Sequence, residues 1–197
     1  CTPACAPPLA PINENFDAGF SPCWSQDLIN DDFDWELEDG GTPSNGTGPD
    51  DDVSIGGNYM YTEASAPRQD GDFAIMYSEE IDLSTLTNPE IRFYTHMYGS
   101  AIGELQVDVF DNGSYTTIFN KIGEQVDAWV EEVILINPTS TIVHFRITGI
   151  LGVNANGDTW PGDIAIDEFS VVEAIANDIE VSNTIMMSNC TFSNSEQ

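Results

Sequence analysis

Basic residues are scarce in this chain. Lysine and arginine together account for only four of its 197 residues, against 34 aspartates and glutamates, so the formal net charge is −30. Proteins that bind nucleic acids neutralise phosphates with basic side chains, and this composition excludes that class. It excludes attachment to anionic membranes for the same reason. The acid excess either serves only solubility or is offset in part by bound divalent cations, and both can hold together.

Long apolar runs and catalytic motifs are also lacking. The sequence contains no window of 18 apolar residues, so we expect no insertion into a bilayer. Its two histidines lie outside any HExxH motif, and it has no nucleophile elbow, phosphate-binding loop or dinucleotide fingerprint. Carboxylates are so abundant that any particular glycosidase pair is weak evidence. These absences predict a non-catalytic protein.

The four cysteines include no CxxC pair, which argues against a zinc ribbon or a thioredoxin-like site. Cys1, Cys5 and Cys23 lie near the N-terminus and Cys190 near the other end. Disulfides in an oxidising compartment are the better interpretation, and the favoured pair is Cys5 with Cys23. Cys1 then either pairs with Cys190 or stays free. Four cysteines allow three pairings, and the sequence alone does not decide among them.

Apolar residues alternate with polar ones along much of the chain. The pattern is clearest in residues 91–97, 105–109 and 143–147, where every second side chain is expected to face inward. Asn112-Gly113 lies between two apolar runs, which predicts a tight hairpin. Many short strands joined by turns, without a βαβ rhythm, predict an all-β sandwich of two packed antiparallel sheets.

The phase of this alternation changes near the end of the pattern. Ile164 and Ile166 fall on one face, whereas Phe169 and Val171 are out of phase with them. A change of phase inside a strand predicts a β-bulge, and a bulge would re-aim the side chain of Asp167.

The chain divides into three predicted parts. Residues 1–15 contain four prolines and are expected to form an extended lead-in without structure of its own. Residues 16–174 hold the sandwich. Residues 175–197 are interpreted as a linker and the truncated first strand of a following module. A mature secreted segment would have this organisation.

Calcium is the best use for clustered carboxylates, because a hard cation takes several oxygen ligands. The acidic segments 30–34 and 154–158 lack the glycine and glutamate spacing of an EF-hand. The alternative to an EF-hand is a calcium site assembled from carboxylates on separate strands. Asp17 on the predicted first strand and Asp167 on the last are plausible partners, since the first and last strands of a sandwich often lie side by side.

Several motifs follow one another in an order that resembles a known family. They are Asn15-Phe16-Asp17, Cys23-Trp24-Ser25-Gln26, the acidic and aromatic segment 31–36, the Gly48-Pro49 loop, the strand at 59–65, the aromatic strand and glycine turn at 93–107, the spacing of Gly123, Gln125 and Trp129, and the closing strand at 162–168. Over residues 16–173 the chain resembles the MAM domain, a module named after meprin, neuropilin and receptor phosphatase mu.

The resemblance implies a jelly-roll β-sandwich that is extracellular, lacks catalytic activity and serves adhesion or substrate docking within a larger protein. It also implies a structural cation, with Asp17, Asp34 and Asp167 at the matching acidic positions. Asp52, after the Gly-Pro loop, and Asp72 are weaker candidates for the same site.

Two departures from the animal members bear on these expectations. Ile91 stands where many of them have a third cysteine, and Cys190 lies well beyond the closing strand, so the second disulfide of the family is not expected. The acidity, the lead-in and the truncated following module resemble a secreted multidomain bacterial protein.

Trp160 is the strongest candidate for contact with a ligand. It lies in the turn-rich segment 157–162 between Asp158 and Asp163, where an exposed ring would stack on a sugar while the carboxylates accept hydroxyl hydrogen bonds. The alternative is that the ring folds back over a sheet as a lid. Tyr59 and Tyr98, half-polar aromatics on predicted strand faces, are further candidates.

These inferences predict a calcium-binding docking module, either secreted or at the cell surface, that is a covalent part of a larger protein. Its acidity would repel sulfated or uronic-acid polysaccharides unless calcium bridged them, so the expected partner is a neutral or amine-bearing glycan or a cell-surface protein. The alternative is a structural spacer or a homophilic adhesion domain without glycan binding.

Overall fold

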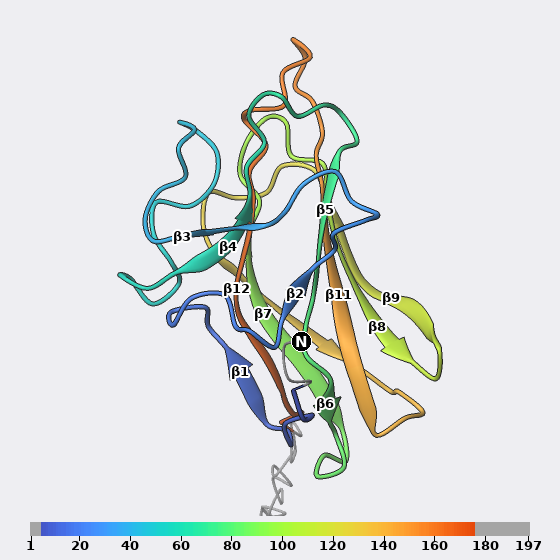
Figure 1. The fold of residues 1–197 in the computed structure, drawn as a ribbon. Helices are drawn as coiled ribbons and strands as arrows, with labels where there is room; N and C mark the ends of the chain where they lie inside the picture. Colours follow the sequence, from blue (N-terminus) through green and yellow to red (C-terminus); the bar gives the residue numbers. More distant parts are fainter. Residues whose placement is uncertain (1–4, 176–197) are drawn as a thin grey trace, which may run out of the picture.

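The structure, a computed structural model, describes residues 5–175, which form two packed β-sheets (Figure 1). Every strand pairing in this part of the chain is antiparallel, apart from two isolated parallel bridges. The predicted all-β sandwich is therefore confirmed. Residues 5–175 contain no helix long and apolar enough to cross a membrane. The predicted following module lies almost wholly outside the described residues.

The first sheet has the strand order β10-β7-β12-β4-β3, with β1 paired to β12 beside this path. Its strands are β1 (Ile12–Glu14), β3 (Glu36–Glu38), β4 (Tyr59–Thr62), β7 (Pro89–His96), β10 (Val130–Leu135) and β12 (Ile164–Glu173).

The second sheet has the order β2-β5-β11-β8-β9, with β6 paired to β11. Its strands are β2 (Ser25–Gln26), β5 (Phe73–Tyr77), β6 (Ile81–Asp82), β8 (Glu104–Asp111), β9 (Ser114–Ile122) and β11 (Ile142–Ile150). In Figure 1 this sheet faces the first across the core.

The core between the sheets includes the alternating residues that the sequence predicts. Phe93 on β7, Val107 on β8 and Phe145 on β11 are all fully buried. The ring of Phe169 from β12 stacks on that of Phe93 with centroids 5.9 Å apart and lies 5.3 Å from that of Phe145. The contact between Phe169 and Phe145 joins the two sheets, and each of these aromatic pairs contributes about 0.5–1.5 kcal/mol beyond its buried area.

The predicted hairpin joins β8 to β9. Asp111 pairs with Ser114, and the two residues between them, Asn112 and Gly113, have φ values of 51° and 88°. Positive φ at both central positions is the signature of a type I′ turn, which suits the twist of the flanking strands.

The lead-in differs from its prediction. Ile12–Glu14 form β1 and pair with Phe169–Val171 of β12, and Ala10 is buried in the core. The side chain of Asn13 also donates to Glu168 Oε2 at 2.8 Å. The end of the lead-in is thus a strand of the first sheet, because β12 offers it an unpaired edge beyond β4.

Candidate functional site

The last strand changes partner half-way along one edge. Ile164–Ile166 of β12 pair with β4, whereas Phe169–Val171 pair with β1. Between these segments the register with β7 shifts after Asp167, and Glu168 has a φ of 51°. This is the bulge that the change of phase predicts. It leaves Asp167, only 1% exposed, at the gap between the two partner strands.

Two loops meet beside this gap. One follows β1 and carries Asp17, and the other, residues 50–58, precedes β4; the two lie side by side in Figure 1. The Asn58 amide donates to Asp17 Oδ1 at 3.0 Å, and the Val53 amide donates to Asp167 Oδ2 at 3.1 Å. The second loop therefore links the first loop to the last strand.

Gly57 brings two carboxylates to one point. A Cβ atom on this residue would overlap Asp17 Oδ1 and would lie 2.6 Å from Asp52 Oδ2. Asp52 is 4% exposed, and its Oδ1 atom is buried without a hydrogen-bond partner. An unpaired buried acceptor is costly, so this oxygen requires an explanation. We call the carboxylates of Asp17, Asp52 and Asp167 the Gly57 cluster.

The electrostatics of the cluster are set by burial and by amide donors. Burial raises the pKa of Asp167 to about 7, although the Val53 and Glu168 amides oppose the rise. Burial also acts to raise the pKa of Asp52, but hydrogen bonds from Ser54 and the Gly57 amide outweigh it and leave the pKa below its usual range. None of the ion pairs within residues 5–175 involves the cluster. Its negative charge therefore has no basic neighbour to offset it.

The donor set of the Gly57 cluster fits a hard divalent cation. Calcium prefers carboxylate and carbonyl oxygens, and here the buried, unpartnered Asp52 Oδ1 belongs to a carboxylate that approaches Gly57 together with that of Asp17. The described residues contain no group of three or more His, Cys, Asp or Glu side chains already arranged as a metal site. Binding would therefore require the two loops to bring the carboxylates closer together.

Asp34 and Asp72 lie elsewhere, contrary to the expectation that all five aspartates converge. Phe33 forms a bridge with Ala74 of β5, which places the residues on either side of it along the second sheet. Asp34 lines a surface hollow with Arg68, and Asp72 accepts a hydrogen bond from the Gln69 amide at 2.8 Å. The sequence cannot show that this segment still runs along the second sheet before β3 joins the first.

A second candidate surface surrounds Trp160. The residue is 44% exposed and, together with Asp158, lines a hollow of about 420 Å³. Arg68 and Asp70 line the same hollow from the loop after β4, at the upper end of the sandwich in Figure 1. The exposed ring favours the interpretation of Trp160 as a surface contact over that of a lid.

The other aromatic and acidic candidates divide between surface and interior. Tyr98 is half-buried and lines a separate hollow with Asp127. Tyr59 is fully buried and its hydroxyl donates to the Gly40 carbonyl, so the structure does not place it where a ligand would reach it. Asp163 is also fully buried and accepts a hydrogen bond from the Ala64 amide at 3.0 Å, so it does not flank Trp160 on the surface.

Comparison with known proteins decides the family. Residues 15–174 match the family described as MAM domain, meprin/A5/mu. The chain belongs to the MAM domain family. This confirms the family that the ordered motifs suggest.

Relatives of this MAM domain include much longer animal proteins. The chain is 33% identical over 162 residues to MAM domain-containing glycosylphosphatidylinositol anchor protein 1 of Rattus norvegicus. This match covers 75% of this chain and 16% of the relative. It is 25% identical over 157 residues to neuropilin-1a of Danio rerio, covering 73% of this chain and 15% of the relative. The chain thus spans about a sixth of the length of these relatives.

Solved structures with the same fold show much lower sequence identity. A cleaved adhesin domain of Lys-gingipain from Porphyromonas gingivalis matches with a TM-score of 0.56 and 14% identity, over 84% of this chain and 99% of that domain. TmCBM61, solved in complex with β-1,4-galactotriose, matches with a TM-score of 0.52 and 17% identity, over 81% of this chain and 94% of its own. These likenesses support the jelly-roll sandwich as the fold.

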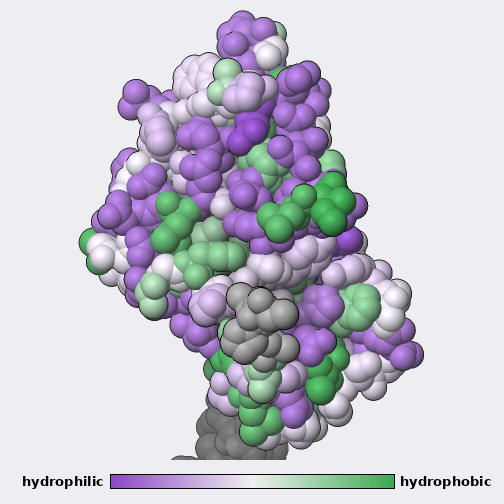
Figure 2. All heavy atoms as spheres, in the orientation of Figure 1, coloured by the Kyte–Doolittle hydropathy of each residue, from purple (hydrophilic) through white to green (hydrophobic). Residues whose placement is uncertain are grey.

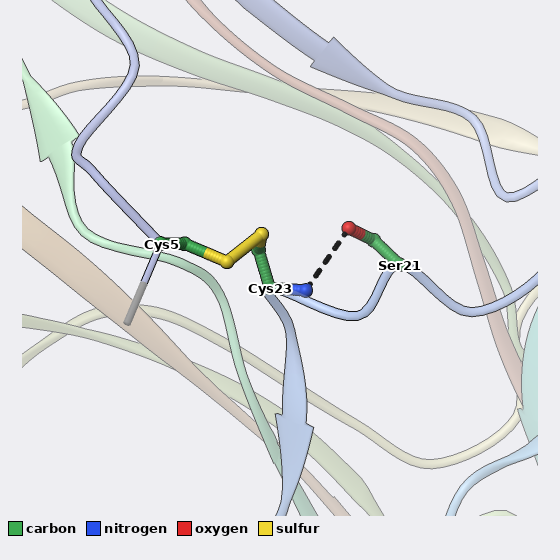
Figure 3. Close-up of a disulfide and its surroundings, with 3 residues drawn as sticks. All are labelled: Cys5, Ser21 and Cys23. Carbon is green, nitrogen blue, oxygen red and sulfur yellow. Dashed lines mark hydrogen bonds between the residues drawn. A yellow bond between two sulfur atoms is a disulfide. The ribbon is translucent and has the colours of Figure 1, made fainter. Parts of the chain in front are cut away.

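A disulfide closes the N-terminal part of the MAM domain. Cys5 bonds to Cys23, which is the favoured pair, and the Cys23 amide donates to Ser21 Oγ at 3.3 Å (Figure 3). The bond ties the lead-in to the start of β2 in the second sheet, while β1 between them belongs to the first. Cys1 and Cys190 lie outside the described residues.

Sequence reasoning misses Gly57 and the burial of Asp163. Gly57 follows another glycine in an acidic loop, so the sequence offers no reason to single it out. Asp163 carries a buried Oδ2 atom without a hydrogen-bond partner, and burial raises its pKa to about 7. Its signal in the sequence is an aspartate at the start of an apolar strand, which also occurs at exposed positions.

Proposed function

We propose that this MAM domain is a non-catalytic, calcium-stabilised recognition module that docks a larger extracellular protein onto a polymer or a cell-surface partner. The observation that carries the proposal is the half-exposed Trp160 beside Asp158 in an open hollow. Recognition surfaces of this kind combine an aromatic face with a few polar groups on a rigid scaffold. The likeness to adhesin and sugar-bound structures concerns the fold alone.

Calcium, in this proposal, is structural. Bound at the Gly57 cluster, it would neutralise carboxylates on two loops and on the last strand. The protein's part is to hold these groups together: the Val53 amide orients Asp167, and the Asn58 amide orients Asp17. Fixing the loops at the edge of the first sheet would also reduce the self-repulsion of a strongly acidic chain.

The hollow at Trp160 restricts the partner by its charge. Asp70 and Asp158 line it with a single basic residue, Arg68. A neutral or amine-bearing sugar ring would stack on the indole and donate hydroxyl hydrogen bonds to the carboxylates, whereas a sulfated or uronic-acid chain would be repelled.

An extracellular location is part of the proposal. The Cys5–Cys23 disulfide supports it, because disulfides persist in oxidising compartments. The names of several relatives include a glycosylphosphatidylinositol anchor, which is a property of those proteins. A bacterial origin stays a prediction.

Retention on insoluble polymers tests the docking function. Chitin, cellulose and agar would be compared as supports in calcium and in EDTA, using the wild type, Trp160→Ala and the control Leu135→Ala, since Leu135 is 63% exposed on the distant strand β10. The proposal predicts that one polymer retains the wild type and the control but releases Trp160→Ala. Retention by none, together with concentration-dependent dimerisation, would contradict it and favour a spacer or homophilic adhesion domain.

A further inference from the structure

Two aliphatic side chains project from the loop that joins β2 to β3. Leu28 is 84% exposed and its neighbour Ile29 is 88% exposed. Figure 2 shows strongly apolar atoms where Figure 1 places this loop, surrounded by hydrophilic surface. Single exposed apolar residues are ordinary, but two adjacent large ones at the tip of a loop form a patch that calls for an explanation.

The start of this loop is fixed by Asp27. One carboxylate oxygen accepts hydrogen bonds from the Ile29 amide at 2.9 Å and the Asn30 amide at 2.8 Å, and the other accepts one from the Tyr77 hydroxyl at 2.7 Å. The Asn30 side chain also donates to this carboxylate. Asp27 therefore fastens the backbone beneath Leu28 and Ile29 to the second sheet.

The end of the loop is fixed to β5 in the same way. Asp31 accepts a hydrogen bond from the Ile75 amide at 2.9 Å, and Asp32 accepts one from the Phe73 amide at 3.1 Å. Phe33, the next residue, is buried in the core. Both ends are anchored, so the two aliphatic side chains are held out from a rigid backbone, and a partner would bind them without the cost of ordering the loop.

An acidic hollow of about 670 Å³ adjoins the aliphatic pair. Its lining residues are Asp27, Leu28, Asp31, Asp32, Phe33, Asp34, Trp35, Glu36 and Arg68. The only basic residue among them is Arg68, whose guanidinium lies over the Phe33 ring, 4.3 Å from its centroid. One positive charge against five carboxylates leaves this hollow negative, and Leu28 belongs to both the hollow and the aliphatic pair.

We propose that this surface binds a basic protein segment that carries aliphatic side chains: lysine or arginine enters the acidic hollow, and aliphatic groups pack on Leu28 and Ile29. The charge of the hollow selects a cationic partner, which argues against a phospholipid surface and against a second copy of this acidic chain. The inference rests on the proposed docking function, for which it names a protein partner at a second hollow, which shares Arg68 with the hollow at Trp160.

Labelled octapeptides provide the test. Peptides of alternating Lys-Leu, Lys-Ser and Glu-Leu would be titrated against the whole chain by fluorescence anisotropy, and the bound site would be mapped by NMR chemical shifts. The variants are Leu28→Ser/Ile29→Ser, the charge variant Asp34→Asn/Glu36→Gln, and the control Ile122→Ser/Leu135→Ser, whose aliphatic residues are 68% and 63% exposed on other strands. The serine changes at 28 and 29 alter side chains only, so the backbone amides that anchor the loop to Asp27 are retained.

The proposal predicts that Lys-Leu binds the wild type about tenfold more tightly than Lys-Ser. The change at 28 and 29 should remove this difference, the charge variant should weaken both lysine peptides, and the control should bind as the wild type does. The proposal would be overturned if Lys-Leu and Lys-Ser bound equally, or if Glu-Leu bound as tightly as Lys-Leu. Chemical-shift changes that map to another surface would also overturn it. The proposal would also be overturned if no peptide bound and the wild type, but not Leu28→Ser/Ile29→Ser, co-sedimented with phosphatidylcholine vesicles. Polymer retention through Trp160 is measured separately, so either proposal can fail without the other.

Discussion

The carboxylate of Asp167 accepts a hydrogen bond from the backbone amide of Val53 at 3.1 Å, across 114 positions of sequence. Asp167 faces this amide because β12 bulges where it changes partner from β4 to β1. The contact fixes the loop before β4 against the last strand. Asp17 reaches the same loop through the Asn58 amide. Three distant segments thus meet at one acidic site at the edge of the first sheet.

Gly57→Ala tests whether the site needs the close approach of the two carboxylates to this glycine. The new methyl group would overlap the Asp17 carboxylate and crowd that of Asp52, so we expect a loss of roughly 1–3 kcal/mol in the free energy of unfolding. The change should also reduce any stabilisation by calcium. Urea unfolding in EDTA and in calcium measures both effects.

Gly40→Ala is the matched control, because a Cβ atom there meets no other atom within 4 Å and Gly40 is not among the glycines with positive φ. It should leave both the stability and the calcium response close to those of the wild type. Equal behaviour of the two alanine variants would contradict the crowded geometry at Gly57.

Asp163 should make stability depend on pH. Burial raises its folded-state pKa to about 7, opposed by a hydrogen bond from the Ala64 amide. The folded state therefore holds a proton that the unfolded chain releases. The stabilising contribution of this proton is fully present below about pH 4, the unfolded pKa, and is lost as the pH rises through about 7.

Asp163→Asn keeps an acceptor for the Ala64 amide but cannot ionise. We expect its unfolding free energy to fall less between mildly acidic and mildly alkaline pH than that of the wild type. The fall should be smaller in the variant by at least about 1.4 kcal/mol, which is the free energy that corresponds to one pKa unit. Urea titrations of both proteins in EDTA measure it, and parallel pH profiles would show that Asp163 is not protonated in the folded state.

The disulfide should supply a large part of the stability of the N-terminal segment. Cys5 and Cys23 are 18 residues apart, and closing a loop of about this size stabilises a protein by about 3 kcal/mol in the chain-entropy model. Cys5→Ser/Cys23→Ser should lose about this amount in urea unfolding, and reductant should lower the wild type towards the variant. A wild type and variant of equal stability would contradict a structural role for the bond.

Local patterns predict much of this fold. The positive-φ turn at Asn112-Gly113 fixes the β8–β9 hairpin, and the phase change around Asp167 marks the bulge in the last strand. Both signals lie within a few consecutive residues. The backbone geometry that they require is strict, so few other structures are compatible with them.

The site is less predictable because its members come from separate segments. Asp17, Asp52 and Asp167 come together only through strand order. Asp34 leaves the group because Phe33, the residue before it, is still bridged to β5 of the second sheet. Tyr59 shows a related difficulty. Its half-polar side chain suggests a surface position, but it packs against the half-buried Trp129 and its hydroxyl donates to the Gly40 carbonyl.

Thermal melting in calcium and in EDTA tests the central claim that the Gly57 cluster holds a cation. A ligand bound only by the folded state must raise the midpoint, by the equivalent of about 2.7 kcal/mol at a hundredfold excess over its dissociation constant. We predict a higher midpoint in calcium for the wild type and for Asp34→Asn, whose carboxylate lies elsewhere, and a much smaller rise for Asp52→Asn. Equal midpoints in calcium and EDTA for the wild type would contradict the account.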